Sequence, residues 1–261
     1  MKNVEKPTTH PVAVIIPYNK NEAGLAVLLA TLQAQLIPPQ KIIVIDTSGN
    51  HSGYAIAKRF YTDTIDVIVE YVKGAGIYEA WNRGIELAKG LDCIIINDDV
   101  LVPMNFVDLM YTTGKVTGAY CVVPETPAKD HYKKNVDMPF SWWGAIPDTK
   151  KQDLEVVQWM PGFVYMLTAK CIREIGLIDT KFKVWYGDDD YQTRILKKAV
   201  TSKNMGIVKV KSLFVYHYGG SSYKYNSNPE LMKVIEQDKK YFISKHSKSL
   251  KATSDSLKPK K

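Results

Sequence analysis

Two clusters of acidic residues follow apolar stretches of this chain, and both could support chemistry. The first is Asn97-Asp98-Asp99, which comes after an isoleucine-rich run, and the second is Asp188-Asp189-Asp190. Carboxylates this close repel one another, and the repulsion raises their pKa values unless a cation is shared. We therefore interpret the first cluster as a site for a divalent metal and a diphosphate. We interpret the second cluster as the source of a general base.

Phosphate groups need neutralising partners, and the two usual glycine-rich motifs for them are absent from the sequence. A dinucleotide-binding loop would follow the first strand, but that position holds Pro17-Tyr18-Asn19-Lys20-Asn21, with no glycine before Gly24. A P-loop is absent as well. Acidic residues at a strand end can hold Mn²⁺ or Mg²⁺ instead, because hard cations take carboxylate and phosphate oxygens. The sequence therefore predicts a metal-bound diphosphate, with Mn²⁺ or Mg²⁺ as the cofactor.

The elements that must position these residues alternate regularly through the first hundred residues. Apolar, β-branched runs predict strands at residues 12–16, 42–45, 65–71 and 93–96, and apolar residues at helical spacing predict helices between them. Such alternation is typical of an α/β fold with a mostly parallel central sheet flanked by helices.

The carboxyl ends of the four predicted strands all carry polar residues. Ligands of parallel α/β sheets bind beyond these ends, so the sequence predicts one site along one edge of the sheet. The four segments are Pro17-Tyr18-Asn19, Asp46-Thr47-Ser48, Val72-Lys73-Gly74 and Asn97-Asp98-Asp99.

The second half of the chain is less regular. We expect strands at residues 119–123, 163–167, 207–210 and 213–217, and a helix at 191–199. Neither an internal repeat nor a Gly/Ser-rich linker is present, so we predict a single domain over residues 1–244. It would comprise a nucleotide-binding half (about 10–118), an acceptor-binding half (about 119–228) and a C-terminal helix (about 229–244).

The net charge of +8 is concentrated at the C-terminus, where residues 239–261 contain eight Lys and one Asp. We expect residues 245–261 to form a basic, disordered tail. A solubilising role is favoured, and contact with nucleic acid or with an anionic membrane is the alternative.

Cysteine content and hydropathy predict the compartment. The three cysteines, Cys93, Cys121 and Cys171, lie in apolar segments, which favours reduced thiols in a cytoplasmic protein over a disulfide framework. No apolar run approaches the roughly 18–20 residues that cross a bilayer, so we expect no stable membrane insertion.

Taken in order, these motifs resemble the family 2 glycosyltransferases with the GT-A fold, and among them the rhamnosyltransferase-like branch. The resemblance extends from about residue 12 to residue 222. The matching segments are the opening strand (12–19), the second strand with its base-binding aspartate (43–48), the "N-x-G" helix (81–85), an "L-N-x-D" version of the metal-binding D-x-D (95–100), the acceptor-side stretch (161–163 and 175–179), and "E-D-x-D-L-x-x-R" (187–194).

Two positions depart from the family pattern. Gly187 stands where the family usually has Glu, so that a supporting carboxylate is missing or replaced. Asn97 replaces the first Asp of D-x-D, which leaves Asp99 as the direct metal ligand, while Asp98 points away or acts through water.

The resemblance implies an inverting, metal-dependent transferase of the hexosyltransferase type. It would move a sugar from a nucleoside diphosphate, UDP- or dTDP-linked, to a hydroxyl acceptor such as a glycan. Asp188 would be the catalytic base, and Asp99 and His217 would hold the metal. The residues expected to bind the nucleotide sugar are Pro17, Tyr18, Asn19, Asp46, Lys73, Asn82, Arg83, Asn97 and Asp98, and those expected to bind the acceptor are Trp142, Trp143, Gly162 and Asp189.

Several of these residues also have a structural interpretation. Asp46 could be a turn residue after its strand, and Asp188-Asp189-Asp190 could favour the N-terminus of a helix. Trp142 and Trp143, which could stack on a sugar or a base, could equally belong to the core.

Three other functions remain as alternatives. A nucleotidyltransferase would need a glycine- and Arg/Lys-rich loop after the first strand, which the sequence lacks. A non-catalytic sugar-nucleotide or carbohydrate-binding module would share the binding residues without the turnover. The Lys-rich tail would suit a transferase that acts on hydroxylated bases of DNA.

Overall fold

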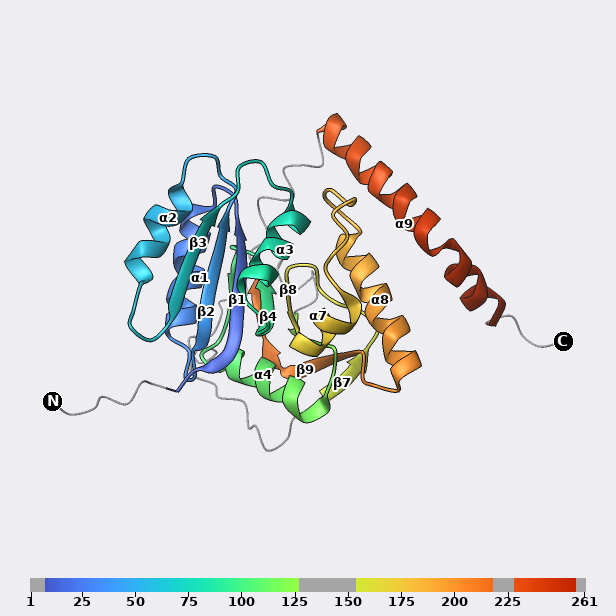
Figure 1. Cartoon of the computed structure of the whole chain (residues 1–261), viewed down its shortest axis with the longest axis horizontal. Helices are drawn as coiled ribbons and strands as arrows, with labels where there is room; N and C mark the ends of the chain where they lie inside the picture. Colours follow the sequence, from blue (N-terminus) through green and yellow to red (C-terminus); the bar gives the residue numbers. More distant parts are fainter. Residues whose placement is uncertain (1–7, 127–153, 218–227, 257–261) are drawn as a thin grey trace, which may run out of the picture.

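A computed structural model describes residues 8–126, 154–217 and 228–256 of the chain (Figure 1). An eight-stranded sheet runs through the molecule in the order β3-β2-β1-β4-β8-β6-β9-β7. A second sheet pairs only two short strands, β5 and β10. The strands of the large sheet are β1 (His10–Tyr18), β2 (Pro39–Asp46), β3 (Asp66–Tyr71), β4 (Asp92–Ile96), β6 (Cys121–Glu125), β7 (Leu154–Val157), β8 (Val164–Leu167) and β9 (Ile207–Phe214), and those of the small sheet are β5 (Val100–Leu101) and β10 (Tyr216–His217).

The strands β3, β2, β1 and β4, which are neighbours in the large sheet, are parallel to one another. The next strand across the sheet, β8, runs in the opposite direction. β8 pairs antiparallel with β4, and Ile96 at the end of β4 lies opposite Val164 at the start of β8. Residues that precede β8 therefore lie at the same edge of the sheet as residues that follow β4. The predicted α/β class and mostly parallel sheet are confirmed.

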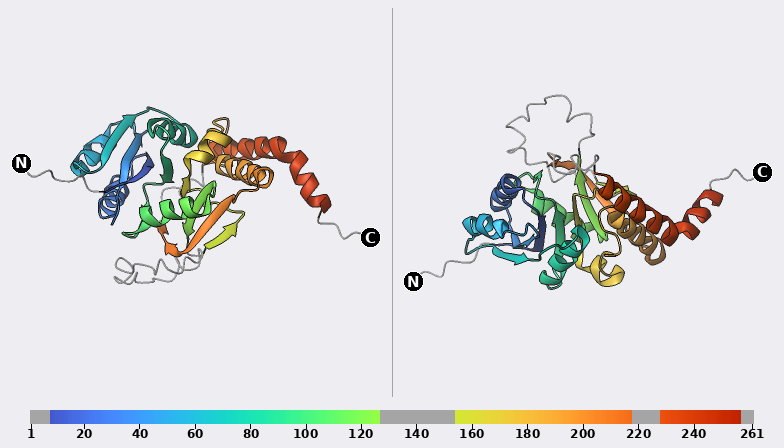
Figure 2. Two further views of the ribbon diagram at one scale, coloured as in Figure 1. Left: turned by 60° about the horizontal axis from the view of Figure 1, so that its bottom comes forward. Right: turned by 90° about the horizontal axis from the view of Figure 1, so that it is seen from above.

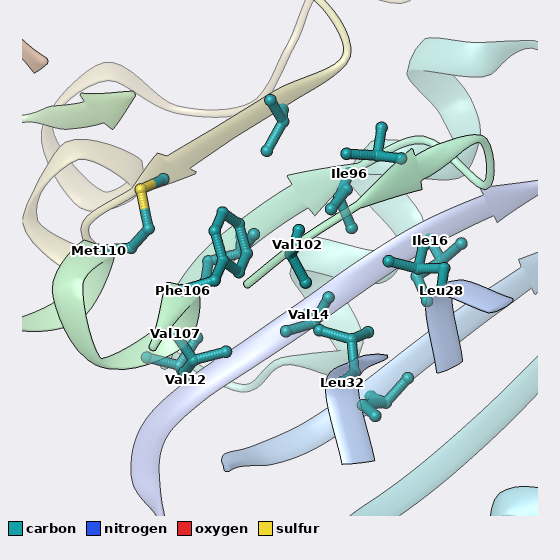
Figure 3. Packing of buried hydrophobic residues seen from close by; sticks show 14 of the residues in the cluster. Val12, Val14, Ile16, Leu28, Leu32, Ile96, Val102, Phe106, Val107 and Met110 are labelled. Atoms are coloured by element: carbon teal, nitrogen blue, oxygen red, sulfur yellow. The ribbon is translucent and has the colours of Figure 1, made fainter. Parts of the chain in front are cut away.

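Helices cover both faces of the sheet, which explains why its central strands read as continuous apolar runs. Along β1, Val12, Val14 and Ile16 face one core, whereas Ala13 and Ile15 face the other. Figure 3 shows the first core, where these β1 side chains meet side chains of α1 and α4. The helices of this face are α1 (Glu22–Gln33), α2 (Ser52–Ala57), which continues as a 3-10 turn (Lys58–Phe60), and α4 (Phe106–Thr117), and those of the other face are α3 (Ile77–Leu87), α7 (Ala169–Ile175) and α8 (Gly187–Ser202).

Two helices differ in length from the sequence-based expectation. α8 begins at Gly187 rather than at residue 191, so the second acidic cluster forms its first turn. The last helix, α9, runs from Pro229 to Ser256, so residues 245–256, expected in a disordered tail, are helical. Lys245 and His246 both contact Asp190 of α8, which supports the helix beyond the expected end. Figures 1 and 2 show α9 beside α8, with its C-terminal end projecting beyond the rest of the fold.

Of the elements that the structure describes, α4, β5 and β7 were not predicted from the sequence. All three cysteines are buried and free, as expected. Within the described residues, no helix combines the length and the apolar character that crossing a membrane requires.

Candidate active site

A cavity of about 720 Å³ opens at the carboxyl edge of the parallel strands. Its walls come from the ends of β1 and β4, the N-terminal part of α3, the segment 183–189, and the α9 residues Leu231 and Ile235. The two acidic clusters, about ninety residues apart in the sequence, thus meet at one cavity. The predicted site residues that line it are Pro17, Tyr18, Asn19, Asn97, Asp98, Gly162, Asp188 and Asp189.

Asp99 and His217 are brought together by the two-stranded sheet. His217 of β10 pairs with Val100 of β5, which directly follows Asp99 in the chain. Nε2 of His217 consequently lies 3.0 Å from Oδ1 of Asp99. The imidazole also stacks on the ring of Phe163, with the centroids 4.1 Å apart and the planes at 10°. The β5–β10 ladder and this stacking together fix the orientation of the histidine.

The chemistry of this pair fits a divalent cation. The Asp99–His217 contact has the length of a hydrogen bond but not its geometry, and within the described residues Oδ1 of Asp99 and Nε2 of His217 are both buried without a hydrogen-bond partner. The buried Oδ1 of Asn97 also finds no partner in the part of the chain that the structure describes. Buried polar atoms are normally satisfied, so these atoms indicate a missing ligand.

The protein supplies few candidate ligands here. Among the described residues, no group of three or more His, Cys, Asp or Glu side chains could enclose a metal ion. A cation held by Asp99 and His217 would therefore complete its coordination with water and phosphate oxygens, as Mg²⁺ and similar hard ions commonly do.

Asp98 lies beside this pair in a buried position. Burial raises the pKa of its carboxyl to about 7, and the negative charge of Asp99 adds to the rise. The side-chain amide of Asn21 donates to Asp98 Oδ1 at 3.2 Å and works against that rise. The same Asn21 caps α1 by accepting from the backbone N–H of Gly24, so the start of α1 is tied to the acidic cluster.

Asp188 faces the cavity from the first turn of α8. Burial raises the pKa of its carboxyl, and the hydroxyl of Tyr78, 3.3 Å from Oδ1, lowers it in part. A Cβ at Gly162 would lie 2.2 Å from Oδ2 of Asp188, so only glycine leaves room for the carboxylate there. Burial and the charge of Asp188 raise the pKa of Asp189 to about 6. Two interacting carboxyls titrate as a pair, so Asp188 and Asp189 are coupled in their ionisation.

Gly162 and Phe163 connect the two sides of the cavity. Gly162 gives Asp188 its space, and the Phe163 ring stacks on His217. The Phe163 carbonyl also accepts a hydrogen bond of 2.9 Å from the backbone N–H of Asn97.

Asp46 lies outside the residues that line the cavity, although it directly follows Ile45 at the end of β2. Its buried carboxylate accepts backbone hydrogen bonds from Ser48 and from Gly53, each 2.9 Å long. These bonds support the turn between β2 and α2, as in the structural interpretation of the sequence. The neighbouring Thr47 does line the cavity.

Three further residues expected at the donor do not line the cavity. Asn82 is buried and bridges to the backbone of Ile178, donating to its carbonyl at 2.8 Å and accepting from its N–H at 2.9 Å. Arg83 forms ion pairs with Glu70 and Glu86. Lys73 is exposed. Their roles at the donor remain predictions, and Trp142 and Trp143 lie outside the described residues.

Several residues of the cavity were missed by reasoning from the sequence. Tyr78, Trp81 and Trp185 line it, and Trp185 is half-exposed. Neither Trp81, which lies in the "N-x-G" helix, nor Trp185, three residues before Asp188, was assigned to the site from the sequence. No local pattern could have shown that Leu231 and Ile235 of α9 would form a wall.

Comparison with known proteins gives a family and a fold. The family model "Glycosyl transferase family 2" matches residues 13–166. Among solved structures, the chain is similar to the crystal structure of GalNAc-T7 with UDP, GalNAc and Mn²⁺, at 15% sequence identity and a TM-score of 0.59 over 95% of this chain and 58% of that chain. It is also similar to the crystal structure of S. aureus TarS 1-349, at 14% identity and a TM-score of 0.59 over 95% of this chain and 75% of that one.

The chain spans little more than half the length of the GalNAc-T7 chain. At such low identities the likeness to both structures concerns the GT-A fold alone. No curated protein matches the sequence.

Proposed function

The chain belongs to glycosyl transferase family 2, and we propose that it is an inverting, metal-dependent hexosyltransferase acting on a nucleoside-diphosphate sugar. The observation that carries this proposal is that Asp188 meets Asn97 and Asp98, the residues just before Asp99, at one cavity. Transfer of a sugar from a nucleotide to a hydroxyl requires a base on one side of the sugar and a diphosphate site on the other. The rhamnosyltransferase-like branch remains a prediction from the sequence motifs.

The donor would occupy the part of the cavity next to β1 and β4. Pro17, Tyr18 and Asn19 would contact the nucleoside, and Asn97 and Asp98 would lie near the diphosphate. UDP or dTDP is the proposed nucleotide. The similar GalNAc-T7 structure is described with UDP and Mn²⁺, which supports both the nucleotide class and the metal.

Asp99 and His217 would hold the divalent ion, Mn²⁺ or Mg²⁺. When bound, the ion supplies positive charge that neutralises the diphosphate leaving group. The protein's own contribution is to hold both ligands in place through the β5–β10 pairing and the stacking on Phe163.

Asp188 would act as the general base. Its ionised carboxylate takes the proton of the acceptor hydroxyl while the acceptor oxygen forms a bond to the anomeric carbon. The bond from that carbon to the diphosphate oxygen breaks, and the nucleoside diphosphate leaves with the electron pair. Because attack comes from the face opposite the leaving group, the anomeric centre inverts. A positioned base contributes about 10²–10⁴ in rate.

The acceptor is proposed to be a glycan. Gly162 and Asp189 lie on the base side of the cavity, where an acceptor hydroxyl must approach. Trp142 and Trp143 remain predicted acceptor contacts. The three buried, free cysteines support the proposed cytoplasmic location.

The first test is a thermal-shift panel of UDP, dTDP, GDP and CMP, each measured with Mn²⁺ and with EDTA. A nucleotide at a hundredfold excess over its Kd should stabilise the native state by about 2.7 kcal/mol. We expect a metal-dependent shift with UDP or dTDP, and no shift with any nucleotide would refute the donor site.

The second test separates an enzyme from a binding module. In Asp188→Asn, sugar transfer should fall by about 10²–10⁴ while nucleotide binding is retained. Unchanged turnover in this variant would exclude Asp188 as the base.

A further inference from the structure

Asp238, in the middle of α9, is a buried carboxylate bound to the backbone of another segment. It is 3% exposed. Its two oxygens accept hydrogen bonds from three consecutive backbone N–H groups, those of Lys183 (3.0 and 3.1 Å), Val184 (2.8 Å) and Trp185 (3.0 Å). Burying a carboxylate is costly unless its oxygens are hydrogen-bonded, so this contact defines how α9 and residues 183–185 fit together.

The segment that Asp238 holds is part of the candidate active site. Lys183, Val184 and Trp185 all line the cavity. The segment leads into Tyr186, whose φ of +68° places a non-glycine residue in the left-handed region. α8 starts at the next residue, and its first turn carries Asp188. The position of the proposed base thus depends on a short, strained connection.

A left-handed conformation at a tyrosine is strained and persists only where neighbouring contacts fix it. Asp238 fixes the residues before Tyr186. On the other side, the hydroxyl of Tyr78 accepts a 3.0 Å hydrogen bond from the N–H of Gly187. The strained residue therefore lies between two anchored points.

α9 is also attached to the fold by contacts that do not involve this segment. Lys245 bonds to Asp179 at 2.6 Å and to Asp190 at 2.9 Å, and His246 bonds to Asp190 at 2.8 Å. The helix thus has anchors near residue 246 that are independent of residues 183–185. Asp238 therefore positions residues 183–185 in addition to any part that it plays in the docking of α9.

We propose that Asp238 is a positioning residue of the active site. By holding the N–H groups of residues 183–185, it fixes the acceptor-side wall of the cavity and the start of α8, and so the place of Asp188. The proposal rests on the proposed function of Asp188 as the base. It predicts that losing the carboxylate impairs catalysis more than nucleotide binding, since the donor contacts lie on β1 and β4.

The test compares Asp238→Asn with a matched control, Lys245→Met, which weakens the docking of α9 without touching residues 183–185. An asparagine keeps the shape of the side chain but removes its negative charge and replaces one of the two accepting oxygens by an NH₂ group. In Asp238→Asn, hydrogen exchange of the amides in a peptide covering residues 183–185 should be at least about tenfold faster.

Turnover is measured as hydrolysis of UDP-glucose, UDP-galactose, UDP-N-acetylglucosamine and dTDP-rhamnose, with water as the acceptor. For a donor that the unaltered protein hydrolyses, kcat of Asp238→Asn should fall at least about tenfold, whereas the Kd for UDP with Mn²⁺ should stay within about twofold. Lys245→Met should lower Tm but change neither the amide exchange nor kcat by more than about twofold.

Two results would overturn the proposal. Unchanged exchange at residues 183–185 in Asp238→Asn would show that the carboxylate does not hold the segment. An equal loss of kcat in Lys245→Met would show that Asp238 acts only by docking α9. If the unaltered protein neither hydrolyses a donor nor binds UDP, the proposed function fails, and the exchange data alone decide whether Asp238 fixes the segment.

Discussion

The ring of Tyr78 occupies the space that a side chain at Gly187 would need. A Cβ at position 187 would lie 2.5–2.7 Å from three carbon atoms of the ring. The Tyr78 hydroxyl meanwhile accepts from the N–H of Gly187 and lies 3.3 Å from Oδ1 of Asp188. Tyr78 thus fills the space that a side chain at position 187 would need, and it contacts the proposed base directly.

This relationship predicts that Gly187→Ala is destabilising. Tyr78 is 2% exposed and cannot move aside, so the added methyl group should cost about 1–3 kcal/mol, as overpacking typically does. Combining it with Tyr78→Leu should cost less than the sum of the two single changes, because the smaller side chain removes the clash. Urea unfolding of the four proteins measures this coupling, and additivity within about 0.5 kcal/mol would contradict the clash.

The buried position of Asp188 predicts that Asp188→Asn stabilises the protein at alkaline pH. Because burial raises the folded-state pKa of Asp188, this group contributes most to stability below its unfolded pKa and loses that contribution as pH rises through the folded value. Asparagine carries no charge and also relieves Asp189 of its repulsion. We expect a gain of about 0.5–2 kcal/mol at pH 8 that shrinks towards pH 4.

Asp179 provides a control, because its contribution to stability should depend on pH in the opposite direction to that of Asp188. Burial works against its ionisation, but hydrogen bonds from Lys245 and others lower its pKa to about 2. Its contribution is therefore present above the unfolded pKa and is lost as pH falls through the folded value. Asp179→Asn should be destabilising at pH 8, and denaturant unfolding from pH 4 to 8 measures both variants. A loss of stability in Asp188→Asn at pH 8 would contradict the effect of burial.

The pairing of Asp99 with His217 predicts that both are needed for metal-dependent nucleotide binding. Asp99→Asn and His217→Ala should each weaken binding of UDP with Mn²⁺ by about 10–100-fold. Consider a UDP concentration that stabilises the unaltered protein by about 2.7 kcal/mol. At the same concentration, a variant that binds UDP a hundredfold more weakly would be stabilised by only about 0.4 kcal/mol. His10→Gln is the matched control, since His10 pairs with Asp108 near the start of β1. Full metal-dependent shifts in both site variants would place the ion elsewhere.

A substitution of Asn82 tests whether this residue supports the fold or binds the nucleotide sugar. Its amide is buried and makes two hydrogen bonds to the backbone of Ile178, so Asn82→Ala leaves two backbone groups without partners. Each such group costs about 1–3 kcal/mol. We expect a large fall in Tm with the Kd for UDP unchanged within about twofold. Unchanged stability with at least tenfold weaker UDP binding would support the donor role predicted from the sequence.

The parallel half of the fold was predictable because its strands are buried on both faces. Residues 12–16 and 93–96 form near-continuous apolar runs, and the structure extends the first by two residues at each end and the second by one residue at its start. The gathering of Tyr18, Asn19, Asn97 and Asp98 at one cavity followed from the same reasoning, since ligands bind beyond the carboxyl ends of such strands. The presence of Asp188 at this site was implied by the family resemblance instead.

The missed features depend on contacts between distant segments or on weak local patterns. α4 carries Phe106, Leu109 and Met110 at helical spacing, a signal that was present but not used. Asp238 has no local pattern that marks it, because its partners lie more than fifty residues away. The length of α9 is similarly set by contacts of Lys245 and His246 with α8, and its Lys- and Ser-rich composition had suggested disorder.

The reversal of strand direction at β8 has a consequence for how two reactants are aligned. Because β8 runs opposite to β4, the residues just before it lie beside the residues just after β4. Gly162 faces Asp188, and Phe163 next to it contacts Asn97 and His217. A one-residue slip of β8 would exchange the two faces of the strand and move both contacts at once. In the proposed reaction, the alignment of nucleophile and leaving group would therefore be encoded in the pairing register of one four-residue strand.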